Sequence, residues 1–111
     1  MTLKEFWESK NGCNIEYKNK KFKGAYYGKE LNLWYDNGNT SIPLQGISQL
    51  KELESRCDEY VNGNVLCVRC LKAMKAENYS QYRRWFAAVI CNDCWTKKDE
   101  ENRRDDYSRL D

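Results

Sequence analysis

The sequence predicts an α+β protein, in which a small antiparallel β-meander is flanked by helices and followed by a cysteine-rich module that ends in a helix. Three observations predict this class. Aromatic residues are 14 % of the 111 residues, which supplies large side chains for the core of a short chain in spite of 32 % charged residues. Residues 13–17 alternate between apolar and polar, and aromatic-rich runs separated by turn residues follow as far as 44, as in strands. The last third of the chain carries two close pairs of cysteines.

The first element is predicted to be a short helix that starts after Thr2. Thr2 can cap this helix, and Glu5 stands three positions further on, as in a capping box. One apolar face follows at i, i+3, i+4 spacing, made of Leu3, Phe6 and Trp7. Asn11 and Gly12 are expected to end the helix, because glycine readily takes the left-handed conformation after a last turn.

Three or four antiparallel strands are expected next, over 13–17, 22–27, 31–35 and 40–44. Asn37-Gly38 is the strongest hairpin signal, because Asn-Gly adopts the positive φ angles of a type I′ turn. Pro43 marks the last strand as an edge, since proline cannot donate to a β-ladder.

A second helix is predicted over 46–61, where apolar residues recur every three or four positions and charged residues occupy the rest. The apolar stripe consists of Ile47, Leu50, Leu53, Cys57 and Val61. Asn62-Gly63-Asn64 should end the helix and separate a meander module (1–62) from a cysteine module (63–98), with a charged helical or disordered tail at 99–111. The order α-β-β-β-α resembles double-stranded-RNA-binding domains, but the second helix lacks their lysine-rich start and is net acidic, which argues against that alternative.

Cys67 and Cys70 form one C-x-x-C pair, and Cys91 and Cys94 form another after twenty intervening residues. Four thiolates placed tetrahedrally at about 2.3 Å are the usual structural zinc site, and this spacing belongs to the C-x2-C…C-x2-C class of such sites. We therefore expect one structural Zn2+ bound by these four residues. Two redox pairs or an iron–sulfur site are the alternatives. The other two cysteines, Cys13 and Cys57, are expected to be buried, inert thiols.

Residues around the second pair indicate the type of zinc module. The run 82–90 is strand-like, and helix is expected from Trp95 to Arg109, so that the second pair would stand at a helix N-terminus. With the two cysteine pairs, this order over 65–105 resembles the treble-clef zinc fingers, which consist of a knuckle, a hairpin and a helix that carries the second pair. The glycine or proline common in such knuckles is missing, since Val68, Arg69 and Leu71 occupy those positions. A zinc ribbon, with a strand after the second pair, is the alternative.

Charge is distributed unevenly along the chain, although the net charge is only +2. Residues 65–98 carry seven basic side chains against two acidic ones, a net charge of +5, whereas 99–111 carry three against six. Basic groups beside aromatic rings can bind phosphates and stack on bases. The candidate partner-binding residues are Lys72, Lys75, Arg83, Arg84 and Trp85. The competing interpretation is that the rings pack around the zinc and the charges are merely solvated.

The chain has no histidine, which excludes Ser-His-Asp and Cys-His nucleophile systems and His-Glu-x-x-His metalloproteases. Four cysteine ligands would also leave no position on zinc for a catalytic water. We therefore expect a non-enzymatic, regulatory or inhibitory protein that acts on a protein or nucleoprotein partner, a composition like that of bacteriophage accessory proteins. Direct DNA or RNA binding through 69–98 is the alternative, and an enzyme is a distant third.

The location of the protein is predicted from what the sequence lacks. No stretch approaches the roughly 20 apolar residues that cross a bilayer, and the N-terminus has no apolar signal-peptide core. We expect a soluble cytoplasmic protein, in the host cell if the protein is viral, with no membrane partner. In a reducing cytosol, paired cysteines are metal ligands more often than disulfides.

Overall fold

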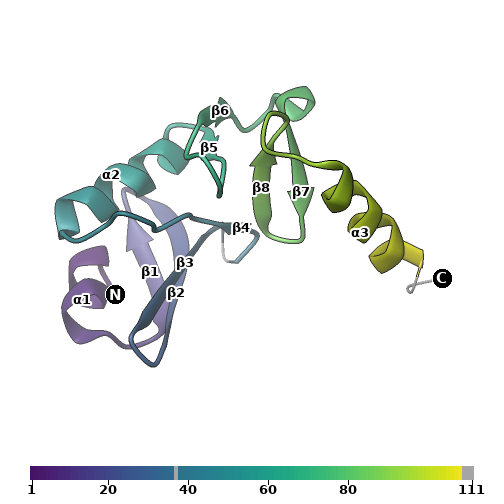
Figure 1. Cartoon of the computed structure of the whole chain (residues 1–111). Helices are drawn as coiled ribbons and strands as arrows, with labels where there is room; N and C mark the ends of the chain where they lie inside the picture. The colour runs from purple at the N-terminus through teal and green to yellow at the C-terminus, as the bar shows by residue number, and fades with distance from the viewer. Residues whose placement is uncertain (37, 109–111) are drawn as a thin grey trace.

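The computed structural model describes residues 1–36 and 38–108, with side chains as far as residue 102 (Figure 1). It confirms the α+β class. The elements are α1 (Leu3–Ser9), β1 (Cys13–Tyr17), β2 (Lys20–Tyr27), β3 (Glu30–Tyr35), β4 (Thr40–Ser41), α2 (Leu50–Val61), β5 (Asn64–Leu66), β6 (Ala73–Lys75), the 3-10 turn η1 (Tyr79–Gln81), β7 (Tyr82–Trp85), β8 (Ala88–Cys91) and α3 (Lys97–Ser108).

The cap of α1 is the predicted capping box. The Glu5 backbone N–H donates to Thr2 Oγ1 at 3.1 Å, and the Thr2 N–H donates to a Glu5 carboxylate oxygen at 3.3 Å. The helix ends earlier than expected, because Lys10, rather than Gly12, takes the left-handed conformation (φ 59°). The Lys10 N–H then donates to the Phe6 carbonyl at 3.0 Å, which satisfies one of the free carbonyls of the last turn.

The predicted meander is present as a four-stranded antiparallel sheet in the order β1-β2-β3-β4. Lys18 and Asn19 both have positive φ and make the tight turn between β1 and β2. The last strand is shorter than the predicted 40–44. Only Thr40 and Ser41 pair with β3, and one further bond joins the Ile42 N–H to the Leu33 carbonyl before Pro43, which has no N–H to continue the ladder.

The second helix begins at Leu50 and not at 46, so this prediction was wrong by about one turn. Gly46 has φ +80°, which an α-helix excludes, and Gln49 is the extended N-cap residue. The extended segment before the helix is tied down by Arg56, which donates to the Pro43 carbonyl at 2.8 Å and to the Gln45 carbonyl at 2.7 Å. These bonds hold the segment against α2, and the Gln45 side-chain amide also donates to the Val68 carbonyl at 2.7 Å.

The region after α2 contains two short hairpins, β5–β6 and β7–β8. The treble-clef resemblance implied a hairpin between the two cysteine pairs, whereas β5–β6 was not predicted. The run 82–90, predicted as one strand-like segment, reverses direction at Phe86, which has φ 54°. A reversal at Phe-Ala is invisible in the sequence, because such turns are normally recognised by glycine or asparagine at the positive-φ position. The third helix begins at Lys97 instead of Trp95.

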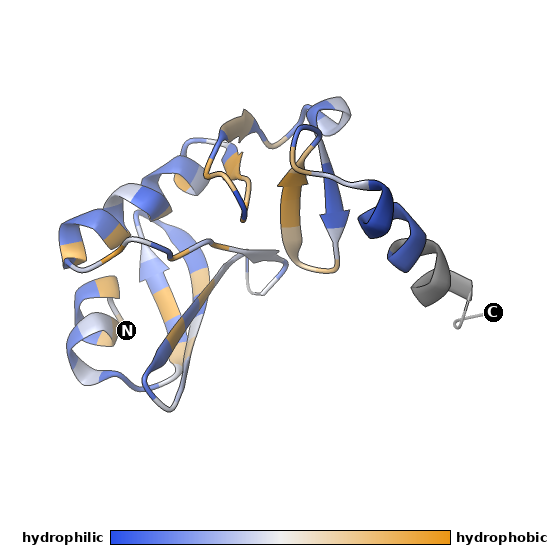
Figure 2. Ribbon diagram, viewed as in Figure 1, coloured by the Kyte–Doolittle hydropathy of each residue, from blue (hydrophilic) through white to orange (hydrophobic). Residues whose placement is uncertain are grey.

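One cluster of buried side chains joins the meander, α2 and the two hairpins. Tyr60 of α2 lies at its centre, with its ring 5.7 Å from that of Tyr35 and its hydroxyl accepting the Leu66 N–H at 3.3 Å. Figure 2 shows that β8 is apolar and that the start of α3 is hydrophilic, and Figure 1 shows α3 extending away from the rest of the fold. Among the described residues, no helix is both long and apolar enough to cross a membrane.

The contact between α1 and the sheet requires a glycine at position 24. A Cβ added there would lie 2.6 Å from Phe6 Cε2, in a part of the core where Phe6 has no exposed surface. We predict that Gly24→Ala lowers the free energy of unfolding by about 1–3 kcal/mol, as overpacking of a dense core does. Denaturant unfolding measures the change. Combining Gly24→Ala with Phe6→Leu should recover part of the loss, and an additive double variant would contradict the explanation.

Candidate metal centre

The first cysteine pair lies in the turn of the β5–β6 hairpin. Leu66 and Ala73 are the last paired residues of that hairpin, and the Cys67 N–H donates to the Lys72 carbonyl at 3.0 Å. The Leu71 N–H folds back to the Cys67 carbonyl at 2.9 Å, which closes a tight loop around both cysteines. This loop points the Cys67 and Cys70 sulfurs in the same direction, towards the end of β8.

The second pair makes a similar loop at the end of the β7–β8 hairpin. Cys91 is the last residue of β8, and its carbonyl accepts the N–H groups of Cys94 at 3.0 Å and of Trp95 at 3.1 Å. Two further bonds join this loop to the first one. The Val68 N–H donates to the Val89 carbonyl at 2.9 Å, and the Cys91 N–H donates to the Cys67 sulfur at 3.3 Å.

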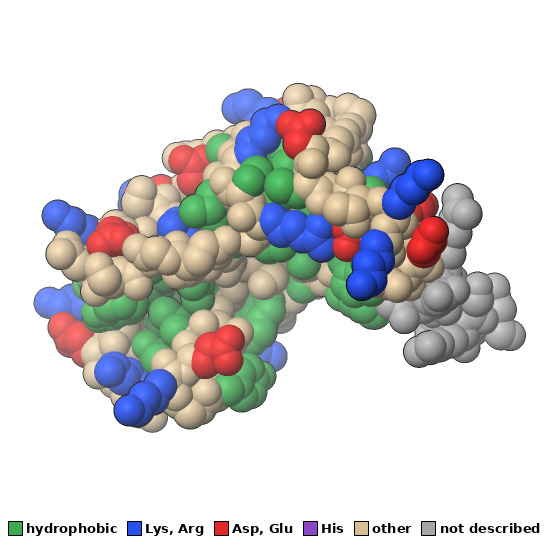
Figure 3. Space-filling view, in the orientation of Figure 1, with side chains coloured by type: hydrophobic (Ala, Val, Ile, Leu, Met, Phe, Trp, Pro, Cys, Tyr) green, Lys and Arg blue, Asp and Glu red, His purple; other side chains and the backbone are tan. Residues whose placement is uncertain are grey.

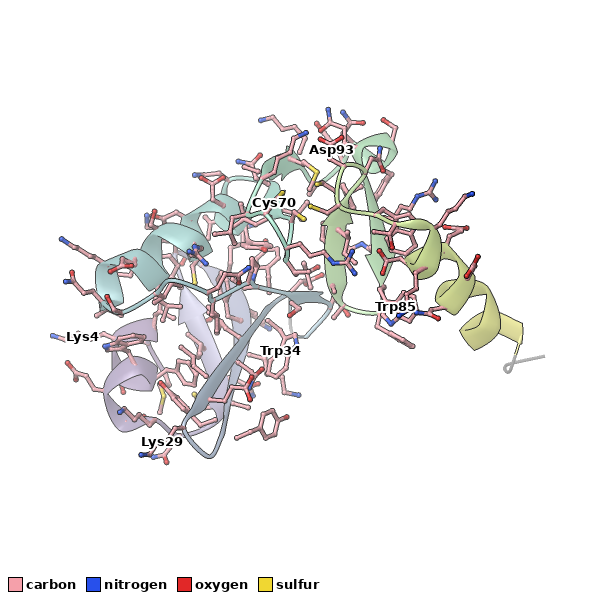
Figure 4. All side chains as sticks on the ribbon, in the orientation of Figure 1. Lys4, Lys29, Trp34, Cys70, Trp85 and Asp93 are labelled. Atoms are coloured by element: carbon pink, nitrogen blue, oxygen red, sulfur yellow. The ribbon has the colours of Figure 1, made fainter. Side chains whose placement is uncertain are left out.

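These two loops bring all four predicted cysteines together, and their sulfurs lie within 4.8 Å of one another (Figure 4). The Cys70 and Cys91 sulfurs are 3.6 Å apart. Four thiolates around a tetrahedral zinc ion at about 2.3 Å would be about 3.8 Å from each other. The arrangement could therefore hold one metal ion with only a small contraction. Cys67 and Cys91 are buried, whereas Cys70 is exposed and Cys94 half-buried.

Backbone N–H groups converge on the Cys67 sulfur. Burial raises the pKa of this thiol, but the surrounding N–H donors, among them those of Cys91 and of Arg69 at 3.4 Å, outweigh burial and lower the pKa to about 6. Donation to the charged form is the physical cause, because an N–H stabilises a thiolate more than a thiol. The thiolate is also the form that binds metal ions.

Arg69 links the first loop to the start of α3. Its guanidinium donates to both oxygens of Asp99 at 2.7 and 2.8 Å, and also to the Cys94 carbonyl at 2.7 Å. Asp99 in turn accepts the Thr96 N–H at 2.8 Å, and its own N–H donates to Thr96 Oγ1 at 3.2 Å, so that the pair forms a capping box for α3. The guanidinium and these donors hold the pKa of the Asp99 carboxyl well below its usual range.

Because Thr96 caps the helix, the second pair does not lie in the first helical turn. The expectation that Cys91 and Cys94 would stand at a helix N-terminus was therefore wrong, and both precede the helix. A helix nevertheless follows Cys94, as in a treble clef, and the strand that a zinc ribbon would place there is not found in the described part of the chain. Leu71, which occupies a common glycine position of zinc knuckles, has φ 67°.

The two remaining cysteines lie apart from this site. Cys57 is fully buried in α2, and burial, with two neighbouring carboxylates, raises the pKa of its thiol to about 12, as expected for an inert thiol. Cys13 is only half-buried, so its predicted burial was overstated. Its sulfur lies 3.0 Å from the Met1 sulfur.

The five candidate partner-binding residues separate into three groups. Arg83 and Trp85 occupy one side of β7 and both approach Trp95, at 5.9 Å from guanidinium to ring and 6.4 Å between ring centroids. Arg84 turns to the other side, where it donates to Thr40 Oγ1 at 3.2 Å. The exposed lysines lie elsewhere. Lys72 approaches Asp93 at 3.7 Å in the two loops, and Lys75 ends β6.

Sequence reasoning missed part of the surface around Arg83 and Trp85. Phe86 is 80 % exposed, and its ring centroid lies 6.2 Å from that of Trp85. Tyr79 is 73 % exposed at the other end of the hairpin. We call this surface the aromatic ridge; it consists of Tyr79, Arg83, Trp85, Phe86 and Trp95. The hairpin turn that assembles it carries no recognisable sequence signal.

Comparisons with protein-family models, with curated proteins and with solved structures find no match for this chain. The resemblance to treble clefs therefore rests on the two cysteine pairs and on the order of the elements around them. The four clustered sulfurs support a small metal-binding protein. Which metal and which partner the protein binds follows from the chemistry of the residues at the site.

The left-handed conformation of Leu71 generates a prediction about the first loop. A left-handed residue with a Cβ costs roughly 1–2 kcal/mol, which glycine avoids at the expense of its larger chain entropy. We expect Leu71→Gly to change the unfolding free energy of the metal-loaded protein by less than about 1 kcal/mol. Val68→Gly, at a neighbouring half-buried position without positive φ, should cost about 2 kcal/mol. Equal losses in the two variants would contradict this account of the loop.

Proposed function

We propose that the protein is a small, zinc-stabilised, non-enzymatic binding protein that regulates or inhibits a protein or nucleoprotein partner. The observation that carries the proposal is the position of the four-cysteine cluster, which lies at the base of the hairpin that displays the aromatic ridge. On this view zinc is a scaffold, and the ridge is the surface that meets the partner.

Zinc is the metal that this donor set favours. Four cysteine sulfurs with no other donor among them select zinc or an iron–sulfur cluster, and C-x-x-C pairs in hairpin turns are typical of structural zinc. A bound Zn2+ and four thiolates together carry a net charge of −2. Counting the seven basic and two acidic side chains of 65–98, the zinc-loaded module would still carry a net charge of +3.

The same ligand set argues against catalysis at the metal. Four thiolates complete a tetrahedral shell, whereas catalytic zinc keeps one position open for water or substrate. The thiol of Cys57 is inaccessible, and the chain has no histidine to act as a general base at neutral pH. A binding role is therefore the simpler proposal.

The ridge has the composition of a contact surface. Trp, Tyr, Phe and Arg are enriched where proteins bind partners. The aromatic rings give large contact areas with few rotatable bonds, and arginine offers several hydrogen-bond donors in one plane. Phe86 is held at the tip of a two-stranded hairpin whose other end is fastened by the cysteine loops. Direct DNA or RNA binding through 69–98 is the second candidate. It is favoured by the Arg83 guanidinium, which lies over the Trp95 ring and makes no hydrogen bond or ion pair with the side chains that the structure describes.

Metal analysis tests the first half of the proposal. The purified protein should contain one zinc per chain, and Cys91→Ser should lose it and increase amide exchange over 65–98, because the ion joins the two loops. Cys13→Ser is the matched control and should keep the zinc. Lowering the pH should release the ion, since protons compete with it for the thiolates. A fully folded protein without any metal would contradict the proposal.

Partner capture tests the second half. The zinc-loaded chain, used as bait in a cell lysate, should retain a partner that Phe86→Ser loses, because the exposed ring is the natural anchor of a contact. Tyr27→Ser is the control, since Tyr27 is 66 % exposed on the meander and lies outside the ridge. Equal capture by both variants would show that the ridge is not the binding surface.

A further inference from the structure

We propose that the aromatic ridge binds single-stranded nucleic acid, with the Arg83 guanidinium on a phosphate and the ring of Tyr79 stacked on a base. This inference rests on the second candidate given for the proposed function, direct DNA or RNA binding, and it names the form of nucleic acid that the same surface would take. Three observations carry it: the donors of Arg83, a polar pocket lined by aromatic rings, and the exposure of Tyr79.

Arg83 differs from the other arginines whose side chains the structure describes. Arg56 and Arg69 donate to backbone carbonyls, Arg69 also to a carboxylate, and Arg84 to a hydroxyl. Within residues 1–36 and 38–102, Arg83 makes no hydrogen bond or ion pair, and its guanidinium lies over the Trp95 ring at 5.9 Å. This contact with the ring uses none of the five guanidinium N–H donors, which stay available for a ligand. Phosphate oxygens match this planar fork with two parallel hydrogen bonds.

A pocket of about 330 Å³ opens beside Arg83. It is lined by Tyr79, Ser80, Tyr82, Arg83, Asn92 and Trp95. Asn92 is held in place by its amide, which donates to the Ser80 carbonyl at 2.7 Å, and its own side-chain carbonyl is left as an acceptor. A pocket with amide and guanidinium groups between aromatic rings suits a flat, polar, aromatic ligand such as a nucleobase, and it suits an aliphatic side chain poorly.

The ridge suits a single strand better than a duplex. Tyr79 is 73 % exposed and its centroid lies 6.0 Å from that of Tyr82, so one face of the ring can receive an unstacked base. The bases of a duplex stay stacked and paired, so none is available to stack on the Tyr79 ring. Figure 3 shows Lys and Arg side chains over the start of α3 mixed with Asp and Glu, and not the continuous basic face that would follow a duplex backbone.

The acidic residues nearest the ridge are largely engaged. Asp99 is paired with Arg69, and Glu100 accepts the indole N–H of Trp95 at 2.9 Å. Lys97 and Lys98, at the start of α3, are exposed and add positive charge near Trp95. Electrostatic attraction of a phosphate chain should therefore be modest, and the dependence of the affinity on salt should be correspondingly shallow.

The test is fluorescence anisotropy of labelled ten-nucleotide dT and U strands with the zinc-loaded full chain. We expect micromolar dissociation constants at low salt, with weakening as salt rises. Tyr79→Ala should weaken binding about tenfold, as loss of one stacked base does. Arg83→Gln should weaken it and reduce the slope of log affinity against log salt by about 0.7, the value for one phosphate contact on a single strand.

Two matched variants lie on the far side of the molecule. Tyr27→Ala removes a tyrosine of similar exposure, and Lys4→Gln removes an exposed cation that Figure 4 places well away from Trp85. Both should bind as the wild type does. Zinc content and circular dichroism confirm that each variant is folded.

The inference is overturned if neither strand binds at low salt, if binding survives both Tyr79→Ala and Arg83→Gln, or if the control variants weaken binding equally. A duplex that binds more tightly than the single strands would overturn it as well. The proposed function is contradicted by a different result, namely that the Phe86→Ser and Tyr27→Ser variants capture the same partner from the lysate. A partner that is lost only by Phe86→Ser and resists nuclease, with no binding to either strand, would support a protein partner and reject nucleic acid.

Discussion

The bonds between the two cysteine loops are the constraint on which the last third of the structure depends. Cys67 and Cys91 are buried in the common core, and the Cys91 N–H donates to the Cys67 sulfur while Val68 and Val89 join the backbones beside them. Two-stranded hairpins are only marginally stable alone in water. β5–β6 and β7–β8 persist because their turns are fastened to one another, and a metal ion held by the four sulfurs would make that fastening stronger.

The position of α3 and of the aromatic ridge follows from the same constraint. Arg69 belongs to the first loop and donates to both carboxylate oxygens of Asp99 at the start of α3. The same carboxylate accepts the Thr96 N–H and so helps to cap α3. Trp95, between the second loop and α3, is brought beside Arg83 and Trp85 of the hairpin. The ridge therefore draws its side chains from η1, β7, the turn after β7 and the residue after the second loop. A change at the metal site would disturb all of them.

This dependence gives the proposed metal a purpose in a chain of 111 residues. A short chain buries a small share of its surface, and large exposed rings cost it further core. Fastening a hairpin by its turn lets Phe86 and Tyr79 face solvent without loss of the fold. The Arg83 guanidinium lies over the Trp95 ring and makes no hydrogen bond or ion pair with the described side chains. These available donors favour a partner that carries phosphate groups.

Interactions between residues close in the sequence determined the meander, the cap of α1 and the grouping of the four cysteines into two pairs. A capping box, alternating strands and C-x-x-C pairs are set by neighbours a few residues apart, so Thr2, Glu5 and Cys67 could be interpreted without a fold. Only the tertiary structure decided the rest. The positive φ angles of Phe86 and Leu71 have no counterpart in the sequence, because neither residue is a glycine or asparagine, and at the Phe86 turn the Ser41 N–H of β4 bonds to the Ala87 carbonyl. The separation of Arg83 from Arg84, and the approach of Trp95 to Arg83, likewise follow from the hairpin that this hidden turn creates.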